Sequence, residues 1–330
     1  MTSDAETLPP ETSPASPSPA ADFADAVVRG LSQPRKVIPA RYLYDRRGSE
    51  LFEAITALPE YYPTRTETGL LDAHASEIGR IAGTGKVVVE FGSGSSTKTP
   101  VFVKAARAAA YVPIDISEGF LRDAATRLSR LLPGLDILPV AADFAKPIAL
   151  PGAVEGRPMI GFFPGSTIGN FAHAAAVDLL RAFRATLGAD PWLAIGIDLR
   201  KNPRLIEAAY DDSAGVTAAF NLNLLARINR ELGGDIPLGA FEHRAVWNDD
   251  AGRIEMHLAA ARDVRFHAAG GSFSLREGET IHTENSHKYT IEEARLLARA
   301  AGWRPVRWWI DARGLFSLHL WRGGADAMEP

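Results

Sequence analysis

The segment VVVEFGSGSSTKT has the clearest chemical potential, because a β-branched run leads into Glu90, Gly92 and Gly94. Glycines at such a turn let the main chain approach a ligand closely. A dinucleotide-binding fingerprint needs a third glycine at position 97, and a phosphate-binding loop needs the same glycine before Lys98, but this chain has Thr97. Both classes are therefore disfavoured. An acidic residue ahead of the first glycine is typical of methyltransferases, and a tight turn without a ligand is the structural alternative.

Two further expected strands also end on residues that suit a nucleoside. Asp115 ends the expected strand within YVPIDIS, at the distance downstream where an acid accepts hydrogen bonds from ribose hydroxyls, although it could also cap a helix. Asp143 and Phe144 end the next segment, where a carboxylate can accept from an adenine amino group while an aromatic face covers the ring. Turn, ribose acceptor and adenine acceptor in this order predict the S-adenosylmethionine site of a class I methyltransferase.

The elements that must position these residues alternate between strands and helices. Segment 48–63 shows helical spacing with Ser49 as its cap and Pro63 at its end, and a second helix is expected over 66–81. Next come expected strands at 86–91, 110–115, 135–144, 159–165 and 192–199, with helices at 100–109, 119–132 and 175–187 between some of them. This alternation predicts an α/β fold whose parallel sheet binds ligands at the carboxyl ends of its strands.

The alternation of strands and helices stops after Lys201 and resumes near residue 290. Helices are expected around Ala208 and over 216–232, and strands at 241–248, 253–261 and 271–275; a helix at 290–302 and strands at 303–311 and 316–323 then close the sheet. We therefore predict a disordered tail at 1–21, rich in Pro, Ser and Thr. Residues 22–64 plus 201–290 are predicted to form a smaller α+β substrate lobe, and 65–200 plus 291–330 a Rossmann-like methyltransferase domain. The active site is expected between them.

Composition narrows the partners of the chain. Its 330 residues are 46% hydrophobic and 23% charged, with a net charge of −4 and no cysteine. Disulfides and thiolate chemistry are excluded, and a negative chain has no general attraction to nucleic acid or anionic lipid. No apolar run is long enough to span a bilayer, so a cytoplasmic protein with a small-molecule substrate is expected. The eight histidines show no metal-ligand spacing, and no metal is predicted.

Longer ordered motifs identify a specific resemblance, which runs from about residue 35 to 325. They are RYLYDRRGSELFEAITALPEYYPTR, EFGSGSSTKT, FFPGSTIGNF, AAYDDSAGVTAAFNLN and TENSHKY. In these stretches the chain resembles the histidine-specific, S-adenosylmethionine-dependent methyltransferases. That family makes hercynine, the trimethylated betaine of histidine, on the route to ergothioneine. The resemblance implies the same donor and the same reaction for this chain, as the first step toward ergothioneine.

The resemblance also implies site residues. For the cofactor it implies Tyr44, Gly92, Ser93, Lys98, Asp115, Asp143 and Phe144. For the amino acid it implies Asn170 and Tyr210 at the carboxylate, Tyr61 and Thr217 nearby, Glu284 and Ser286 at the imidazole, and Phe52, Phe220 and Met256 along the pocket. One position departs from the expected pattern, because polar Asn285 stands between the two imidazole residues, where an aliphatic side chain is expected.

Without the resemblance, several of these residues have simpler explanations. Tyr61 and Tyr62 could be ordinary packing aromatics, and Asn170 could hold a turn. Glu284 stands close to three other polar residues, His282, His287 and Lys288, so a solvated charge cluster is the leading alternative.

Methyl transfer to an amine requires the amine to arrive neutral. Like-charge repulsion from the sulfonium and desolvation lower the amine pKa, so a strong base is not required. We expect Tyr44 and Asn170 to orient the amine, directly or through water, in a monomeric enzyme. Two alternatives stay open: methylation of another amino acid such as tryptophan, and a non-catalytic cofactor-binding regulatory protein.

Overall fold

The computed structural model describes residues 19–94 and 96–324. Most of the predicted tail at 1–21 lies outside the described residues. Its last three residues instead begin the first helix, α1 (Pro19–Leu31). No helix in the described part of the chain is long and apolar enough to cross a membrane.

The larger sheet carries the predicted cofactor loop. Its seven strands run in the order β12-β13-β6-β5-β2-β3-β4. Their bounds are β2 (Val87–Phe91), β3 (Ala110–Asp115), β4 (Val140–Ala141), β5 (Met159–Phe163), β6 (Trp192–Asp198), β12 (Trp303–Ile310) and β13 (Phe316–Gly323). Strands β4, β3, β2, β5 and β6 pair in parallel, whereas β13 is antiparallel to both β6 and β12. This order, with the last strand reversed and inserted, is the class I methyltransferase sheet and confirms the predicted fold class.

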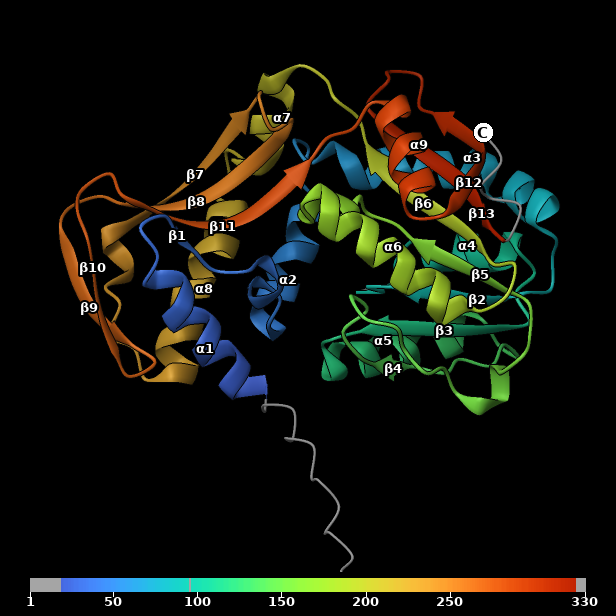
Figure 1. Cartoon of the computed structure of the whole chain (residues 1–330), viewed down its shortest axis with the longest axis horizontal. Helices are drawn as coiled ribbons and strands as arrows, with labels where there is room; N and C mark the ends of the chain where they lie inside the picture. The colour runs from blue at the N-terminus through green and yellow to red at the C-terminus, as the bar shows by residue number, and fades with distance from the viewer. Residues whose placement is uncertain (1–18, 95, 325–330) are drawn as a thin grey trace, which may run out of the picture.

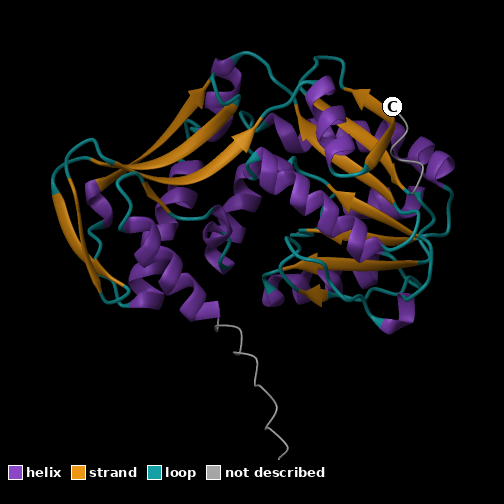
Figure 2. Cartoon of the chain, viewed as in Figure 1, coloured by secondary structure: helices purple, strands orange, loops and turns teal. Residues whose placement is uncertain are grey.

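Helices cover both faces of the larger sheet (Figure 2). One buried cluster joins the sheet to α6 (His173–Leu187) and α9 (Ile291–Ala300). A second joins its other face to α3 (Tyr62–Ala82), α4 (Thr99–Ala105) and α5 (Glu118–Leu131). Strand β2 is buried at every residue, as expected for a parallel strand between helical layers.

A smaller sheet lies beside the larger one (Figure 1). Its order is β1-β11-β8-β7, and a separate hairpin pairs β9 with β10. The bounds are β1 (Lys36–Val37), β7 (Phe241–Asn248), β8 (Arg253–Ala260), β9 (Val264–Ala268), β10 (Gly271–Leu275) and β11 (Thr280–His287). One apolar cluster joins this sheet to α1, α2 (Arg46–Thr56), α7 (Pro203–Tyr210) and α8 (Val216–Leu232). The predicted division into domains stays a prediction.

Short 3-10 helices complete the chain: η1 (Ala40–Leu43), η2 (Gly152–Val154), η3 (Thr167–Asn170) and η4 (Leu238–Ala240). Two of them bring site residues toward the boundary between the sheets. Tyr44 directly follows η1 as its C-cap, and Asn170 is the last residue of η3. Strand β11 reaches η3, because His287 Nδ1 lies 2.9 Å from the carbonyl oxygen of Gly169.

The structure corrects several predicted boundaries. Ser49 lies inside α2, and the cap is Asp45, whose carboxylate accepts a hydrogen bond from Gly48 N at 2.7 Å. Pro63 is in the first turn of α3 and does not end a helix, which suits a residue that lacks an N–H. Of the predicted strand at 135–144, Val140–Ala141 forms β4, and Ile137 makes an isolated parallel bridge to Tyr111 of β3. Strands β9 and β11 have no predicted counterpart. Polar residues interrupt the apolar pattern of β11, whereas β9 alternates regularly and was missed.

Candidate active site

Asp115 meets the glycine turn at the carboxyl edge of the larger sheet. Its Oδ2 accepts a hydrogen bond from Gly94 N at 2.9 Å, and its Oδ1 accepts one from Ser117 N at 2.9 Å. The carboxylate therefore joins the turn after β2 to the turn before α5. Asp115 therefore stabilises the turn before α5, as a helix cap would, and it also lies at the edge of the sheet where ligands bind. Its hydrogen bonds to ribose hydroxyls stay a prediction.

Phe144 lies directly over the glycine turn. A Cβ at Gly92 would come within 3.1 Å of Phe144 Cε1, and the φ of Gly92 is +71°. Both facts require glycine there, and they leave a close approach of main chain and aromatic ring that suits a flat ligand. Asp143 Oδ2 lies 3.8 Å from Arg41 Nη1. Arg41 belongs to η1, beside the smaller sheet. No sequence signal pointed to Arg41.

Glu90, the residue two before Gly92, is held by hydrogen bonds next to the same turn. Its carboxylate is 1% exposed and accepts hydrogen bonds from Thr99 Oγ1 at 2.7 Å and Tyr111 OH at 2.6 Å. Burial raises the pKa of Glu90 to about 7, although these two hydrogen bonds oppose the rise. Both hydrogen bonds go to Oε2, and through this oxygen Glu90 holds the loop in place.

Lys98, a predicted cofactor residue, forms an ion pair with Glu67 of α3. Glu67 is fully buried and also accepts a hydrogen bond from Gly165 N at 2.9 Å. The pair thus ties α3, the loop after β2 and the loop after β5 together. Sequence reasoning missed Glu67, since a single acid inside a helix gives no local sign of burial.

Glu284 lies buried at the boundary between the sheets. It is 7% exposed, and its neighbours His287 and Lys288 are 3% and 1% exposed, so the solvated charge cluster is wrong. Tyr44 OH donates to Glu284 Oε1 at 3.3 Å, and Asn170 Nδ2 donates to the same oxygen at 3.2 Å. Oε2 accepts no hydrogen bond from any residue that the structure describes.

The surroundings of Glu284 control its ionisation. Burial raises the pKa of this carboxyl to about 7, against the opposing effects of the Tyr44 hydrogen bond and the charge of Lys288. A buried carboxylate with one free oxygen can bind an N–H of a ligand.

Ser286 lies next to Glu284 on the same face of β11. Tyr210 OH donates to Ser286 Oγ at 2.8 Å, and Lys288 Nζ donates to it at 2.8 Å. The same lysine contacts Tyr210 OH at 3.0 Å and Asp198 Oδ2 at 2.8 Å. Sequence reasoning placed Lys288 only in a charge cluster and did not find Asp198.

Asp198 holds a fully buried polar network behind the pocket. Tyr62 OH donates to its Oδ2 at 2.8 Å, and Lys201 forms an ion pair with its Oδ1. Burial alone would raise the pKa of Asp198, but the charges of Lys288 and Lys201 hold it below its ordinary value. Tyr62 is thus a partner of a buried charge as well as a packing aromatic.

Aromatic rings gather around Tyr44 and Tyr210, which are hydrogen-bond partners of Glu284 and Ser286. Tyr44 meets the rings of Phe52 and Phe220 edge-on, with centroids 5.5 and 5.4 Å apart. Tyr61 lies 6.2 Å from the ring of Tyr210. Met256, 1% exposed, pairs with Glu284 across β8 and β11. All the predicted pocket residues named so far therefore meet around Glu284 and Ser286.

Comparison with known proteins supplies the family. The model of the histidine-specific, S-adenosylmethionine-dependent methyltransferases matches residues 23–323. The chain belongs to this family. A histidine N-alpha-methyltransferase of Mycolicibacterium smegmatis is 42% identical over 91% of this chain and 96% of that protein. The protein of the same name from Mycobacterium tuberculosis is 39% identical over 89% and 92%. Ergothioneine biosynthesis protein 1 of Neurospora crassa is 30% identical over 89% of this chain and 34% of that protein.

As a member of this methyltransferase family, the chain uses S-adenosylmethionine as methyl donor. The glycine turn fits that ligand, because Gly92 leaves no room for a side chain under Phe144 and Asp115 lies at the next strand end. Ser93 is 5% exposed, and its buried Oγ has no partner among the described residues. Its assignment to the cofactor site stays a prediction.

Thr217 lies at the first turn of α8, one turn before Phe220. Its Oγ1 is buried and has no hydrogen-bond partner in the described part of the chain. The N–H groups of Val216 and Thr217 already donate to Asp212, at 2.9 and 2.7 Å. A substrate carboxylate here would therefore depend on side-chain donors such as the Thr217 hydroxyl, since Asp212 occupies the helix end.

Asn285 does not face the ring pocket. Glu284 and Ser286 pair across the strands with the core residues Met256 and Ile254, whereas Asn285 pairs with Glu255. Because successive strand residues point to opposite faces, Asn285 lies on the outer face of the smaller sheet. The departure from the expected aliphatic residue is therefore outside the pocket.

The same outer face carries one cluster of metal-binding residue types. Among residues 19–94 and 96–324, Glu255, His257 and His282 place candidate ligand atoms within 4.8 Å of one another. Arg253 Nε and Nη2 donate to Glu255 Oε1 at 2.8 and 2.7 Å, and the arginine charge opposes a second cation. We assign no metal to this cluster, and the absence of a metal stays a prediction.

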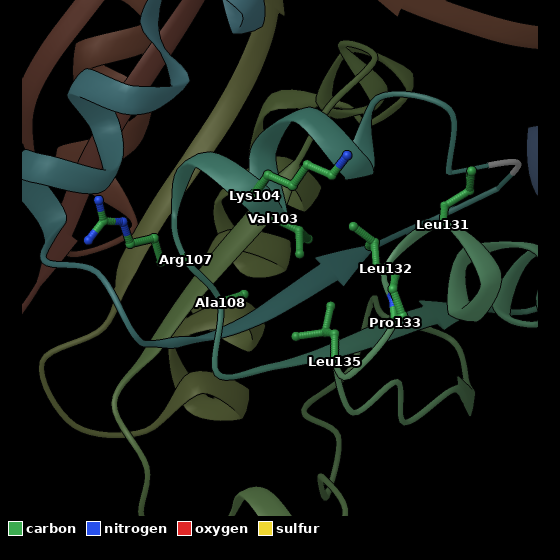
Figure 3. Close-up of a pocket in the computed structure, with 8 residues that line it drawn as sticks. All are labelled: Val103, Lys104, Arg107, Ala108, Leu131, Leu132, Pro133 and Leu135. Atoms are coloured by element: carbon green, nitrogen blue, oxygen red, sulfur yellow. The ribbon is translucent and has the colours of Figure 1, made fainter.

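A surface hollow of about 290 Å³ lies away from this site (Figure 3). It is lined by Val103, Lys104, Arg107, Ala108, Leu131, Leu132, Pro133 and Leu135. These residues lie in or just after the last turns of α4 and α5, so they precede β3 and β4. The hollow is therefore at the opposite edge of the sheet from Asp115 and takes no part in the candidate site.

Proposed function

We propose that this protein transfers methyl groups from S-adenosylmethionine to the α-amino nitrogen of L-histidine, up to the trimethylated betaine hercynine, the first step toward ergothioneine. The observation that carries the proposal is the buried Glu284 with Oε2 free of partners, beside the hydroxyl of Ser286. An imidazole offers an N–H and a second nitrogen, so these two groups match both ring nitrogens. The names of the two mycobacterial relatives support the same substrate.

Tyr44 and Asn170 are the residues that we propose to orient the amine. Each uses one proton to donate to Glu284, which leaves the phenol oxygen of Tyr44 and the Oδ1 of Asn170 as acceptors. Accepting the amine N–H groups would direct the nitrogen lone pair away from both side chains. The residues thus hold the neutral amine and exclude water, and the bound donor supplies the methyl group.

The carboxylate of the substrate is proposed to bind Asn170, Tyr210 and Thr217, with Tyr61 nearby. The free hydroxyl of Thr217 and the second N–H of Asn170 supply donors. A pocket that holds the ring and the carboxylate leaves the small amine end free to turn between transfers. Reaction stops at the quaternary ammonium, because it has no proton left to lose.

Two alternatives have weaker support. The indole ring of tryptophan keeps one N–H but has no second ring nitrogen to accept from Ser286, so that hydroxyl would lose a partner, and this costs free energy. A regulatory protein without catalysis would not need both the glycine turn and the polar ring pocket, and both are present. A cytoplasmic monomer stays our expectation.

Incubation of the purified protein with S-adenosylmethionine and the twenty amino acids, read by mass spectrometry, tests the proposal. We expect a mass gain of three methyl groups on histidine alone. Methylation of another amino acid in preference to histidine would overturn the substrate, and no methylation at all would favour the regulatory alternative. Accumulation of monomethylhistidine at long times would contradict trimethylation.

A further inference from the structure

Lys288 contacts the hydroxyls of both Ser286 and Tyr210. Its ammonium is 0% exposed and lies 2.8 Å from Ser286 Oγ, 3.0 Å from Tyr210 OH and 2.8 Å from Asp198 Oδ2. An ammonium has three protons and no lone pair, so all three contacts are donated by the lysine. Lys288 therefore occupies an acceptor position on each hydroxyl.

This arrangement limits what the two hydroxyls can do. Ser286 Oγ accepts from Lys288 and from Tyr210 OH, so both of its acceptor positions are filled. The proton of Ser286 is then available only for donation. If Tyr210 OH donates to a substrate carboxylate in place of Ser286, Lys288 still donates to both hydroxyl oxygens, so both hydroxyl protons point away from the lysine.

We propose that Lys288 is a positioning residue that fixes Ser286 and Tyr210 as hydrogen-bond donors, so that the pocket binds only a neutral imidazole with its unprotonated nitrogen toward Ser286. This inference rests on the proposed histidine substrate. The ring N–H then faces the free Oε2 of Glu284, and the carboxylate of the substrate receives Tyr210. An imidazolium would place a second N–H against Ser286 and close to the ammonium of Lys288, and like charges in a buried site repel.

The charges around the network keep this direction fixed. Asp198 is 1% exposed and binds Lys288 and Lys201, while Tyr62 donates to it. Lys201 contacts Asp198 and Tyr62 but neither pocket hydroxyl, since its hydrogen bonds go to Asp198 Oδ1 and to Tyr62 OH at 2.7 Å. Lys201 thus shares the carboxylate of Asp198 with Lys288 but not its contacts with Ser286 and Tyr210.

The test compares two substrates in matched variants. The first is histidine, and the second is 3-(pyrrol-2-yl)alanine, which keeps a ring N–H but has no second ring nitrogen. In the wild-type protein the Ser286 proton has no acceptor on the pyrrole, and we expect kcat/KM to favour histidine by roughly 100-fold. In Lys288→Met the Ser286 proton can turn to Tyr210, so the preference should narrow to roughly 10-fold.

Lys201→Met is the matched control, and we expect it to keep the wild-type preference even if it lowers stability. A purely structural role of Lys288 would lower kcat/KM for both substrates alike and leave their ratio unchanged, which would overturn the proposal. In a Ser286→Ala background, adding Lys288→Met should change the ratio no further if the lysine acts through that hydroxyl. Binding of S-adenosylhomocysteine reports that each variant is folded, and Lys288→Gln is the second variant.

A measurement on the unaltered protein tests the same idea without variants. Nitrogen NMR of ring-labelled histidine bound with S-adenosylhomocysteine should show one protonated and one unprotonated ring nitrogen at pH 6. Two protonated nitrogens would overturn the inference. Turnover of histidine by the wild-type protein distinguishes failure of the proposed function from failure of this inference. If the wild-type protein does not methylate histidine, the proposed function is overturned. If it does, but Lys288→Met leaves the substrate ratio unchanged, only the role of Lys288 is overturned.

Discussion

Two buried carboxylates flank the ring pocket, and their surroundings differ sharply. Asp198 binds two lysines and a tyrosine, and these charges hold its pKa below the ordinary value. Among the described residues, Glu284 accepts hydrogen bonds only from the neutral donors Tyr44 and Asn170, and burial raises its pKa to about 7. Both side chains are almost without solvent contact, at 0% and 7% exposed.

The difference separates a structural charge from a binding charge. A buried carboxylate whose partners are complete has nothing left for a ligand, and its removal leaves the partner charges buried and unpaired. A buried carboxylate with one free oxygen carries a cost in the free protein that a ligand N–H can relieve. We therefore expect changes at Asp198 to affect folding and changes at Glu284 to affect catalysis.

The largest expected effect is on stability, in Asp198→Asn. Lys201 and Lys288 would lose their common counter-charge inside the protein, and the free energy of unfolding should fall by about 3–5 kcal/mol. Urea denaturation at pH 7 measures this change. The control is Asp190→Asn, which removes an exposed ion pair with Arg322 and should cost at most about 1 kcal/mol. Equal losses in both variants would contradict the comparison.

Glu284→Ala should spare folding and reduce catalysis. We expect kcat/KM for histidine to fall by two to three powers of ten, equivalent to ~3–4 kcal/mol, with nearly intact cofactor affinity. The preference for histidine over phenylalanine should narrow, because the charge that penalises an apolar ring is gone. Asn285→Ala, on the opposite face of the same strand, should keep the wild-type rate. Full histidine preference in Glu284→Ala would mean that another group binds the ring.

Asp115 extends the comparison to a carboxylate outside the pocket, held by two main-chain N–H groups. In Asp115→Ala we expect S-adenosylmethionine binding to weaken by roughly 1.5–3 kcal/mol, since charge-assisted hydrogen bonds to ribose are lost. Calorimetry measures the affinity, with the exposed Asp123→Ala of α5 as control. Wild-type affinity would leave Asp115 as a residue of the turn only.

The smallest expected effect is a gain in stability in Glu284→Gln. A raised pKa means that the folded state holds its proton to higher pH than the unfolded chain, so stability falls as pH rises from about 4.5 to about 7. The amide can still accept from Tyr44 and Asn170 but carries no charge, so this variant should be about 1–2 kcal/mol more stable at pH 8 and near wild type at pH 5. Thermal unfolding at both pH values measures the difference. An equal shift at both would contradict the assigned ionisation.

The sequence alone determined the larger sheet and its cofactor edge. The predicted bounds are close to the observed ones for four strands, β2, β3, β5 and β6. A parallel strand between two helical layers must be apolar throughout, and the glycine turn or the acidic residue that binds a ligand comes directly after the strand. Glu284 and Ser286 came from the family resemblance, since β11 alternates polar and apolar residues irregularly around a register shift between His282 and Glu284. No local pattern predicted that strand.

Only the tertiary structure decided which charges are buried and which are paired. Asp198 ends β6 and Lys288 follows β11, so a separation of 90 positions becomes a contact of 2.8 Å. Glu67 and Lys98 meet in the same way, from a helix and a loop. Burial and pairing depend on what packs against a side chain from other segments, whereas periodicity reports only the neighbours along the chain. The donors of Ser286 and the free oxygen of Glu284 therefore became visible only in the folded protein.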